Sequence, residues 1–401
     1  MMIPDVYLGF NHAGQFNLHR VLEHCISLRW TDRFFDYSDF EIKVYGWDDQ
    51  VRQDHWVKVP FSDRTMYILS VERTVDAEGN RVSVYKGASL ERYLTQRILM
   101  PGYKSNGDRP VYLVQKLLLD NAIMAPVSAR NFPYFNFPIT DINPEYGRKV
   151  YRNWKLGDNL FSVIRDVCVW AGVGFYIKVD QSSDSGMQFV MSTGVDRRQN
   201  AGSIVYGNQQ LYPDYPNNNG DANAIRLPTG TMVRLHISDG TLTSYRTTLD
   251  RDSKPNYARV GVPRTGGNTG ETTTVYYDAQ LTNTAPANFF RHEVYVDAGS
   301  GPEGETNQQE KERAIRAGRS ELEELGTGDS NWEVDVELTP DFYALYRKVF
   351  DLGDVFDVLS DYSYSLRLKE MTTTIDSNGV TSSAVLGGVN DKSRLETGEA
   401  I

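Results

Sequence analysis

Histidine is the side chain in this sequence best suited to binding a metal ion or to transferring a proton near neutral pH. The six histidines are His12, His19, His24, His55, His236 and His292. His19 and His24 stand close in sequence, but no H-E-x-x-H or H-x-H pair occurs. His236 and His292 lie in strand-like segments without a second ligand nearby. The spacing predicts no metal and no cofactor, although a site assembled in space from distant residues stays open.

The two cysteines, Cys25 and Cys168, carry no nucleophile signature. Cys168 falls on the apolar stripe of a predicted helix, beside Ile164 and Val167, and Cys25 precedes the strand-like segment ISLRW. Neither belongs to a C-x-x-C pair, and no G-x-S-x-G motif occurs in the chain. We interpret both thiols as structural.

Carboxylates are abundant, but their positions favour solvated acids over catalytic ones. Asp48 and Asp49 sit in the turn-like segment WDDQ, and Glu323 and Glu324 lie on the surface of a predicted helix. A glycosidase needs two carboxylates that converge at about 5–10 Å. The sequence shows no sign of such convergence.

Phosphate-binding motifs are also missing, since no G-x-x-x-x-G-K-[ST] occurs and no G-x-G-x-x-G follows a strand. Gly172 and Gly174 in AGVGF follow a predicted helix instead of opening one. The sequence predicts no catalytic or cofactor-binding residue, and we expect a protein that is not an enzyme.

The amino-acid composition also limits the kinds of partner that this protein can bind. The chain has 401 residues with 42 Lys and Arg against 53 Asp and Glu, a formal net charge of −11. This excess of acid gives no general attraction to phosphate backbones or anionic membranes. We find no apolar run long enough for a membrane span and no signal-peptide pattern at the start. The 24 tyrosines suit pleated surfaces and protein interfaces.

The elements that must position these residues begin with strands. Alternation in DFEIKVYG places Phe40, Ile42 and Val44 on one face, and TVDAEGNR predicts a hairpin. Helical spacing follows in three segments: ASLERYLTQRILM, which Ser89 would cap, VYLVQKLLLDNAIM, and GDNLFSVIRDVCVWAG, with Asp158 at its start and Gly172 at its end.

Strand patterns return in VGFYIKVD and MQFVMSTG, and again beyond a polar stretch over 199–223. The sequence predicts a mixed, β-rich α+β fold with two small β-barrel or sandwich domains around a helical insert. We expect a first barrel over 1–105, an insert over 106–198, a second barrel over 199–390 with a helix near 309–325, and a polar tail over 391–401.

Several segments, in this order, carry a family likeness. They are FEIKV, then ILSVERTV, then GASLERYLTQRIL, LLLDNAI, GDNLFSVIRDVCVWAGVGFYI with MQFVMSTGVDRR, and LTSYRTTLDRDSKPNYARVGV. Together they resemble siphophage tail-tip (baseplate) hub proteins, the structural module of tail-associated lysin proteins, which is similar to the trimeric hub of contractile phage tails. The likeness covers most of residues 20–265, with a looser fit to about 390.

The resemblance implies a structural virion protein at the tail tip, made in the cytoplasm of the host bacterium. It implies a homotrimer whose barrels, related to tail-tube subunits, join the six-fold tube to three-fold tip components and form part of the channel for genome ejection. Implied partners are a distal tail protein or the tube end, the tape measure protein, and tail fibre or receptor-binding proteins. DNA would be met only in transit, without specific nucleic-acid binding.

Longer relatives carry a cell-wall hydrolase or a fibre after this region. We expect no such activity here, because the chain ends at Ile401. The alternative is a receptor-binding or carbohydrate-binding tail protein that stacks sugars on Tyr206, Tyr212 and Tyr215. Loops at 199–223 and 263–274 are candidates for partner contacts, as is the charged helix EKERAIRAGRSELEE, and no single interface residue is assigned.

Overall fold

The computed structural model describes most of the chain. No helix within the described residues is both long and apolar enough to cross a membrane. The described residues are 5–138, 142–144, 146–147, 149–179, 186–194, 204–205, 232–236, 242–250, 255–265, 272–280, 291–301, 304–324, 331–338, 352–353, 355–359 and 363–388.

The first strands follow the alternation in the sequence. Phe40, Ile42 and Val44 are buried along β4, and β6 and β7 form the expected hairpin around Asp76 and Gly79. These inward residues make one hydrophobic core with Trp30 and Leu28 at its centre. The strands are β1 (Val6–His12), β2 (Gln15–Leu22), β3 (Cys25–Arg33), β4 (Asp39–Tyr45), β5 (Trp56–Lys58), β6 (Met66–Val75) and β7 (Arg81–Ser89).

The helix expected over 88–100 is shorter than the sequence pattern indicates. A 3₁₀-helix, η1, spans Leu90–Gln96, and Ser89 does not cap it. The Ser89 hydroxyl instead accepts a hydrogen bond from the Ser38 N–H at 2.8 Å. Arg97 is already extended, because its carbonyl accepts from the Leu160 N–H at 2.9 Å. Tertiary backbone bonds therefore end the helix early.

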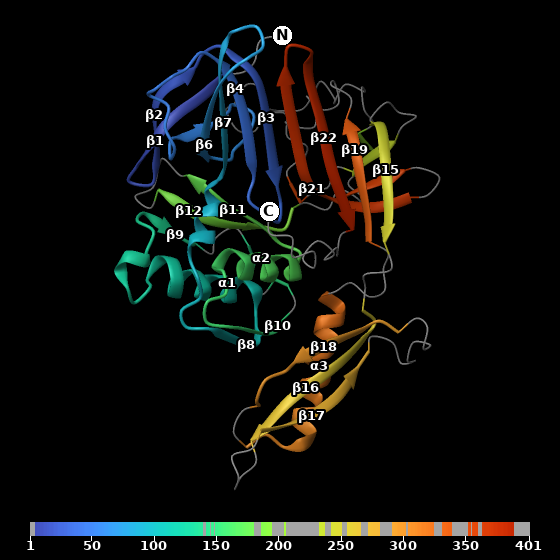
Figure 1. Ribbon diagram of the computed structural model, residues 1–401. Coiled ribbons are helices and arrows are strands. Elements are labelled where there is room, and N and C mark those ends of the chain that lie inside the picture. Colours follow the sequence, from blue (N-terminus) through green and yellow to red (C-terminus); the bar gives the residue numbers. More distant parts are fainter. Residues whose placement is uncertain are drawn as a thin grey trace.

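The next two helices form the layer below the large sheet (Figure 1). Helix α1 (Pro110–Leu118) continues into a π-turn, η2 (Leu119–Ile123), and a 3₁₀ turn, η3, follows at Ser128–Arg130. Helix α2 (Leu160–Ala171) begins just after Asp158 and is capped by Asn159, whose side chain accepts from the Ser162 N–H. Gly172 ends α2 at a φ of 67°, as expected.

Two small sheets flank these helices. β11 and β12 are antiparallel, β9 joins β12 in parallel, and β8 pairs with β10 on the other side of the helices. A large core fills the space between them, including Leu160, Ile164 and Cys168 of α2. The strands are β8 (Tyr103–Asp108), β9 (Phe135–Asn136), β10 (Val150–Trp154), β11 (Gly174–Val179) and β12 (Met187–Ser192).

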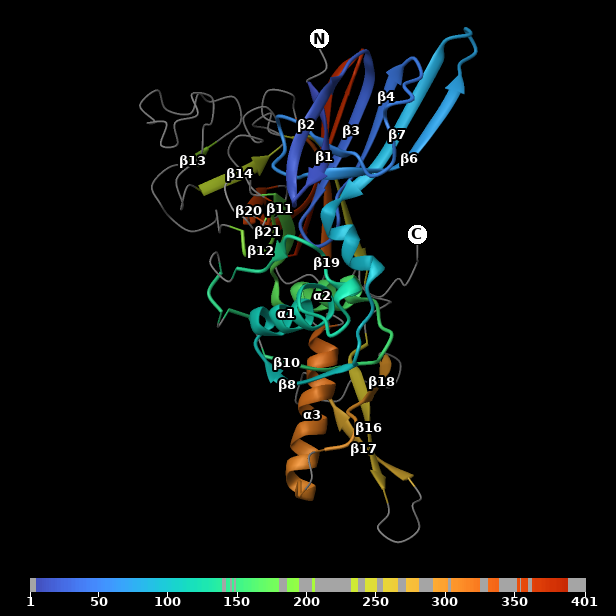
Figure 2. The same ribbon diagram turned by 90° about the vertical axis from the view of Figure 1, so that its left-hand side faces the viewer.

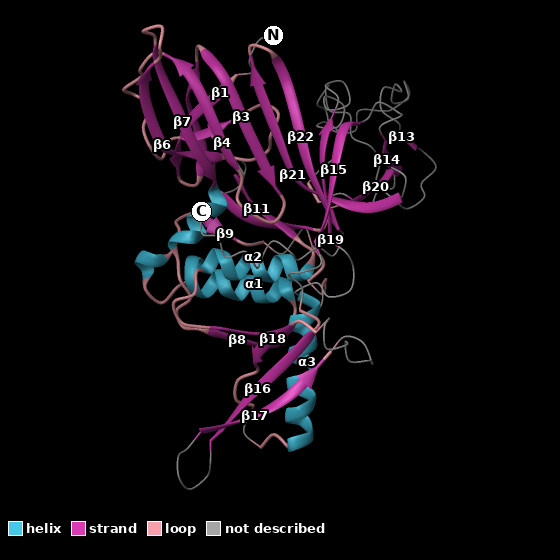
Figure 3. Cartoon of the chain, turned by 45° about the vertical axis from the view of Figure 1, so that its right-hand side comes forward, coloured by secondary structure: helices cyan, strands magenta, loops and turns pink. Residues whose placement is uncertain are grey.

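The C-terminal strands join the N-terminal ones in a single 14-stranded sheet. β21 pairs with β3 from Glu370↔Arg33 to Ile375↔Leu28, so strands from the first and last parts of the chain lie side by side, as Figure 3 shows. The strands of this second block are β13 (Ile204–Val205), β14 (Met232–His236), β15 (Leu242–Asp250), β19 (Asn331–Leu338), β20 (Val355–Leu359), β21 (Ser363–Asp376) and β22 (Gly379–Gly388).

The order of the main path is β13-β14-β20-β21-β3-β4-β7-β6-β5-β1-β2, with β22, β19 and β15 branching from β21. The described strands leave β2 at an open edge and close no barrel. The β-rich α+β class is confirmed, whereas the two strand blocks expected as separate units share one sheet. The division into domains by residue range stays a prediction.

A separate unit lies at the far end of the molecule from the large sheet (Figure 2). It consists of β16 (Tyr257–Thr265), β17 (Thr272–Ala279), β18 (Glu293–Asp297) and α3 (Asn307–Glu324), with strand order β17-β16-β18. We call it the α3 module, and we call the large sheet together with the α1–α2 layer and its two small sheets the body. The sequence pattern placed these strands in the second barrel, but they form a sheet of their own, and α3 packs on one face of it.

Candidate functional site

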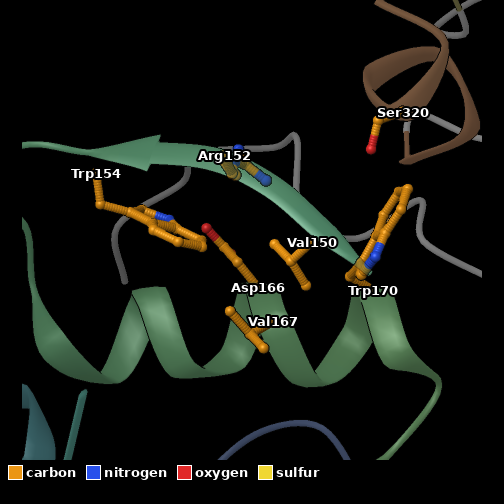
Figure 4. Close-up of a pocket in the computed structure, with 7 residues that line it drawn as sticks. All are labelled: Val150, Arg152, Trp154, Asp166, Val167, Trp170 and Ser320. Carbon is orange, nitrogen blue, oxygen red and sulfur yellow. The ribbon is translucent and has the colours of Figure 1, made fainter. Parts of the chain in front are cut away.

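The α3 module meets the body where α3 and β18 approach β8, β10 and α2. Two hollows lie at this junction. The smaller has a volume of about 10 Å³ and is shown in Figure 4 between Trp154, Asp166 and Trp170, with Ser320 of α3 opposite. A hollow of this size holds one water molecule at most. It is a packing gap and not a ligand site.

Charge at the small hollow is concentrated on Asp166. Burial raises the pKa of this carboxyl, Glu321 of α3 raises it further, and Arg152 and Arg165 oppose the shift. The junction therefore places two acids from different units near one another, with Arg152 between the two hollows.

The larger hollow is a cavity of about 650 Å³ between β8 and β10 of the body and β18 and α3 of the module. Its size is in the range of small-molecule sites, about 300–1,000 Å³. Its lining is Lys104, Ser105, Asn106, Arg152, Asn153, Tyr295, Val296, Asp297, Ala298, Gly304, Glu305, Gln309, Arg313, Arg316, Ala317 and Glu321. We call it the junction cavity.

Hydrogen bonds fix the walls of the junction cavity. Arg313 Nε donates to Glu305 Oε1 at 2.9 Å, and Arg313 Nη1 donates to the Ala298 carbonyl at 2.8 Å. Across the junction, Lys104 Nζ donates to the Ser300 carbonyl at 2.7 Å. The segment between β18 and α3 is thus tied both to its own helix and to β8 of the body.

A second feature with a structural role is the seam between β3 and β21. Arg33 Nε donates to Glu370 Oε2 at 2.7 Å, and Arg33 also pairs with Asp39 of β4. The Thr31 and Thr372 hydroxyls are 3.1 Å apart across the same seam. Burial lowers the pKa of Arg33, but Glu370 and Asp39 more than offset this, so that its pKa is raised. These bonds lock the first and last strand blocks together.

The motif GASLERYL, singled out for its likeness, contains a buried carboxylate that joins the sheet to the helical layer. Glu91 Oε1 accepts from Arg64 Nη1 at 3.3 Å and from the Ile177 N–H of β11 at 2.5 Å. The Glu91 side chain is 1% exposed. Sequence reasoning found the motif but not this role, since nothing local in the sequence pairs Glu91 with β11.

Within the described part of the chain, the histidines do not gather into a metal site. No group of three or more His, Cys, Asp or Glu residues that could hold a metal ion occurs among the described residues. His19 and His55 come together around Phe10, with ring centroids 4.8 and 4.5 Å from that of Phe10. Burial first, and then His19, Arg20 and Arg52, lower the pKa of His55. This cluster packs β1, β2 and β5.

His12 ends β1, and His24 next to β3 is exposed, with a positive φ of 58°. His292 is an exposed residue beside β18, and its N–H donates to Asn256 Oδ1 at 3.1 Å. The side chain of His236 lies outside the described residues. These four positions share no common site in the part of the chain that is described.

The cysteines occupy structural positions. Cys168 is fully buried in α2, and burial raises its pKa. Cys25 begins β3, and burial raises its pKa to about 11. A thiol with a raised pKa is protonated near neutrality and is therefore a poor nucleophile.

Of the other residues considered from the sequence, some are acids that form ion pairs and the rest lie outside the described residues. Asp48 pairs with Arg20, and Asp49 Oδ1 lies 3.2 Å from Arg73 Nη2. Several other candidates lie outside the described residues. They are the side chains of Glu323 and Glu324, the tyrosines at 206, 212 and 215, most of the loop 199–223, and residues 266–271 of the loop 263–274. The carbohydrate-binding alternative based on those tyrosines thus stays a prediction.

The fold is shared with solved phage tail proteins. The 43 kDa tail protein of prophage MuSo2 from Shewanella oneidensis aligns over 96% of this chain and 98% of that chain, with a TM-score of 0.53 and 8% identity. A tail protein from Neisseria meningitidis MC58 aligns over 96% of both chains, with a TM-score of 0.52 and 10% identity. No protein-family model and no curated protein matches the sequence.

Both likenesses run over nearly the whole length of each chain, so the shared fold includes the body and the α3 module. They confirm the resemblance to phage tail proteins that the order of the sequence segments indicated. At 8% and 10% identity they establish the fold alone.

Proposed function

We propose that this chain is a structural hub of a phage tail tip, in which three copies form a ring that joins the six-fold tail tube to three-fold components. The role is mechanical and includes no catalytic step. The observation that carries the proposal is the full-length fold likeness to two phage tail proteins.

The connected architecture supports a load-transmitting role. A ring that must hold while a genome passes needs subunits whose parts do not separate. The β3–β21 pairing and the Arg33–Glu370 bond join the two strand blocks into one sheet. The Glu91–Arg64 pair joins that sheet to the helical layer. The body of each copy would therefore transmit force as one rigid unit.

The net charge of −11 is consistent with a channel for DNA. An acidic lumen repels phosphates, so that DNA slides through and does not adhere. A ring structure with most of the excess acid on its outer wall would contradict this part of the proposal.

In the proposed assembly, the ring binds a distal tail protein or the tube end on one side and fibre or receptor-binding proteins on the other, with the tape measure protein inside. It is a virion component assembled in the bacterial host. Its contact with DNA is confined to passage of the genome.

Negative-stain electron microscopy of the purified chain tests the ring. Three-fold rings with a central hole, alone or after mixing with the tube's terminal protein, are the expected result. Compact single particles that stay single at high concentration and in the presence of that protein would contradict the proposal. Mixing with an unrelated hexameric ring protein serves as the control for nonspecific association.

A further inference from the structure

The sheet of the α3 module has one face on α3 and one face open to solvent. Ala258, Val260 and Val262 of β16 point to α3 and form the module's core. The alternate residues point to the other face, because side chains alternate along a strand. On that face Tyr276 is 51% exposed and Tyr295 is 59% exposed. The α3 module therefore presents two large rings that its own core does not use.

The sheet beneath these rings is shaped to hold them in place. Gly261 pairs with Tyr276 in the register of β16 and β17. A Cβ atom at position 261 would lie 2.2 Å from the Tyr295 hydroxyl, so only glycine lets the Tyr295 ring lie across β16. Beside it, the Arg259 guanidinium is 5.3 Å from the centroid of the Tyr276 ring. Such ordering before binding lowers the entropic cost of holding a ligand.

The tyrosine face continues into the junction cavity, because Tyr295 also lines it. The cavity places neutral hydrogen-bonding groups close to that ring, from β8, β10 and α3. Asn106 and Asn153 are both exposed, and neither carboxamide has a hydrogen-bond partner among the described residues. Gln309 lines the same cavity. Free carboxamides can both donate and accept, which suits a ligand with many hydroxyl groups.

Charges on this surface are largely neutralised by one another. Arg259 Nη1 lies 2.6 Å from Asp278 Oδ1, and Arg291 Nε lies 2.5 Å from Glu293 Oε1. Inside the junction cavity Arg313 pairs with Glu305. The ionisable residues of the cavity lining are Lys104, Arg152, Arg313, Arg316, Asp297, Glu305 and Glu321. This near balance gives little field to attract a polyanion or a polycation.

We propose that the tyrosine face and the junction cavity form a binding site for a neutral saccharide. The apolar C–H face of a sugar ring packs on the exposed ring of Tyr295 or Tyr276. Its hydroxyls hydrogen-bond to the carboxamides of Asn106 and Asn153. The site uses none of the tyrosines considered from the sequence.

Binding is tested by saturation-transfer NMR and calorimetry on the full chain with two neutral probes, tetra-N-acetylchitotetraose and maltohexaose. A sulfated heparin hexasaccharide tests for a charge-driven site. We expect saturable binding of at least one neutral probe. Tyr295→Ala and Asn153→Ala should each weaken it, the first by about tenfold.

Tyr45→Ala is the matched control, because Tyr45 is a 55% exposed tyrosine in the body, at the end of β4. It should leave binding unchanged. The proposal is overturned if neither neutral probe binds at a concentration of about 10 mM, or if the sulfated probe binds more tightly than both. It is also overturned if Tyr295→Ala and Asn153→Ala bind as well as the unmodified chain. Circular dichroism of each variant checks that the exposed substitutions leave the fold intact.

Discussion

The body and the α3 module are built from the same kinds of element but are stabilised in different ways. The body has cores with large buried rings, such as Trp30 and Phe175, and polar bonds that cross between its layers. The buried core of the module consists of Ala258, Val260, Val262, Ala279, Ala314 and Leu322, with larger side chains such as Tyr277 and Ile315 only partly buried against it. Small side chains bury less apolar area, so we expect polar bonds at the surface to contribute a larger share of the module's stability. From this difference we expect the module to have a lower local stability than the body.

We expect the largest loss of stability from a substitution that breaks the connection between the large sheet and the helical layer of the body. Glu91→Ala leaves Arg64 buried without its carboxylate and removes the acceptor of the Ile177 N–H. We expect a loss of about 4 kcal/mol in the free energy of unfolding, as for other broken buried ion pairs. Urea unfolding followed by tryptophan fluorescence measures it.

Glu72→Ala is the control, since Glu72 is an exposed residue of β6 with no ion pair among the described residues. It should change stability by less than about 0.5 kcal/mol. Equal losses in the two variants would show that Glu91 does not join the sheet to the helical layer.

The module is tested through its largest core side chain. Leu322→Ala removes a fully buried residue of α3 and should cost about 3 kcal/mol. Because the module is small and peripheral, we expect the loss to appear as local opening of α3 and β16–β18. Hydrogen exchange should rise in 257–324 and stay unchanged in the strands β3, β4 and β21. A uniform rise over the whole chain would mean that body and module unfold as one unit.

The sequence pattern predicted the elements that are determined by residues close together in the chain. The alternation of Phe40, Ile42 and Val44 gave β4, and the left-handed position of Gly172 ended α2. The pairing of β3 with β21 could not be predicted, because it joins Thr31 to a residue 341 positions away. Register between such distant strands depends on tertiary packing and not on neighbours in sequence.

The junction cavity was also out of reach from the sequence. Its lining comes from β8, β10, β18 and α3, which no motif connects. The role of Glu91 was hidden for the same reason, although the motif around it was visible. Gly261 carries the one local signal at the proposed saccharide site, a glycine inside a strand pattern, which often marks close approach of another group.

A pH dependence should appear in the body. Because the folded pKa of His55 is lowered from its ordinary value of 6.5, the unfolded state binds more protons below that pH. Stability from this group is complete above about pH 6.5 and falls as the pH drops towards the folded pKa, by at most about 1.4 kcal/mol per pH unit.

His55→Gln, which does not titrate, should flatten this part of the stability curve between pH 7 and 5. Hydrogen exchange should show that the extra opening at low pH involves β1, β2 and β5, which surround His55. Parallel stability curves for the two proteins would contradict the assignment to His55.

We expect the smallest loss of stability from a substitution that removes polar bonds at the surface of the α3 module. The Tyr277 hydroxyl donates to Glu310 Oε1 at 2.7 Å, and Arg264 binds the same carboxylate at 2.8 Å. Tyr277→Phe removes the hydrogen bond to Glu310 and a long one from Arg264 Nη2 at 3.4 Å, and it should cost about 1 kcal/mol. The cost should appear as faster hydrogen exchange in the first turns of α3. Tyr276→Phe, on the opposite face of β17, is the control and should have no effect on α3.

The central claim is that three copies of this chain form a hub at the tail tip, and cryo-electron microscopy of intact phage particles that contain the chain tests it most directly. The account predicts density for three copies around the tail axis at the tip, between the tube and the distal components. Absence of the chain from purified particles, or density for it only at another position or in another copy number, would contradict the account.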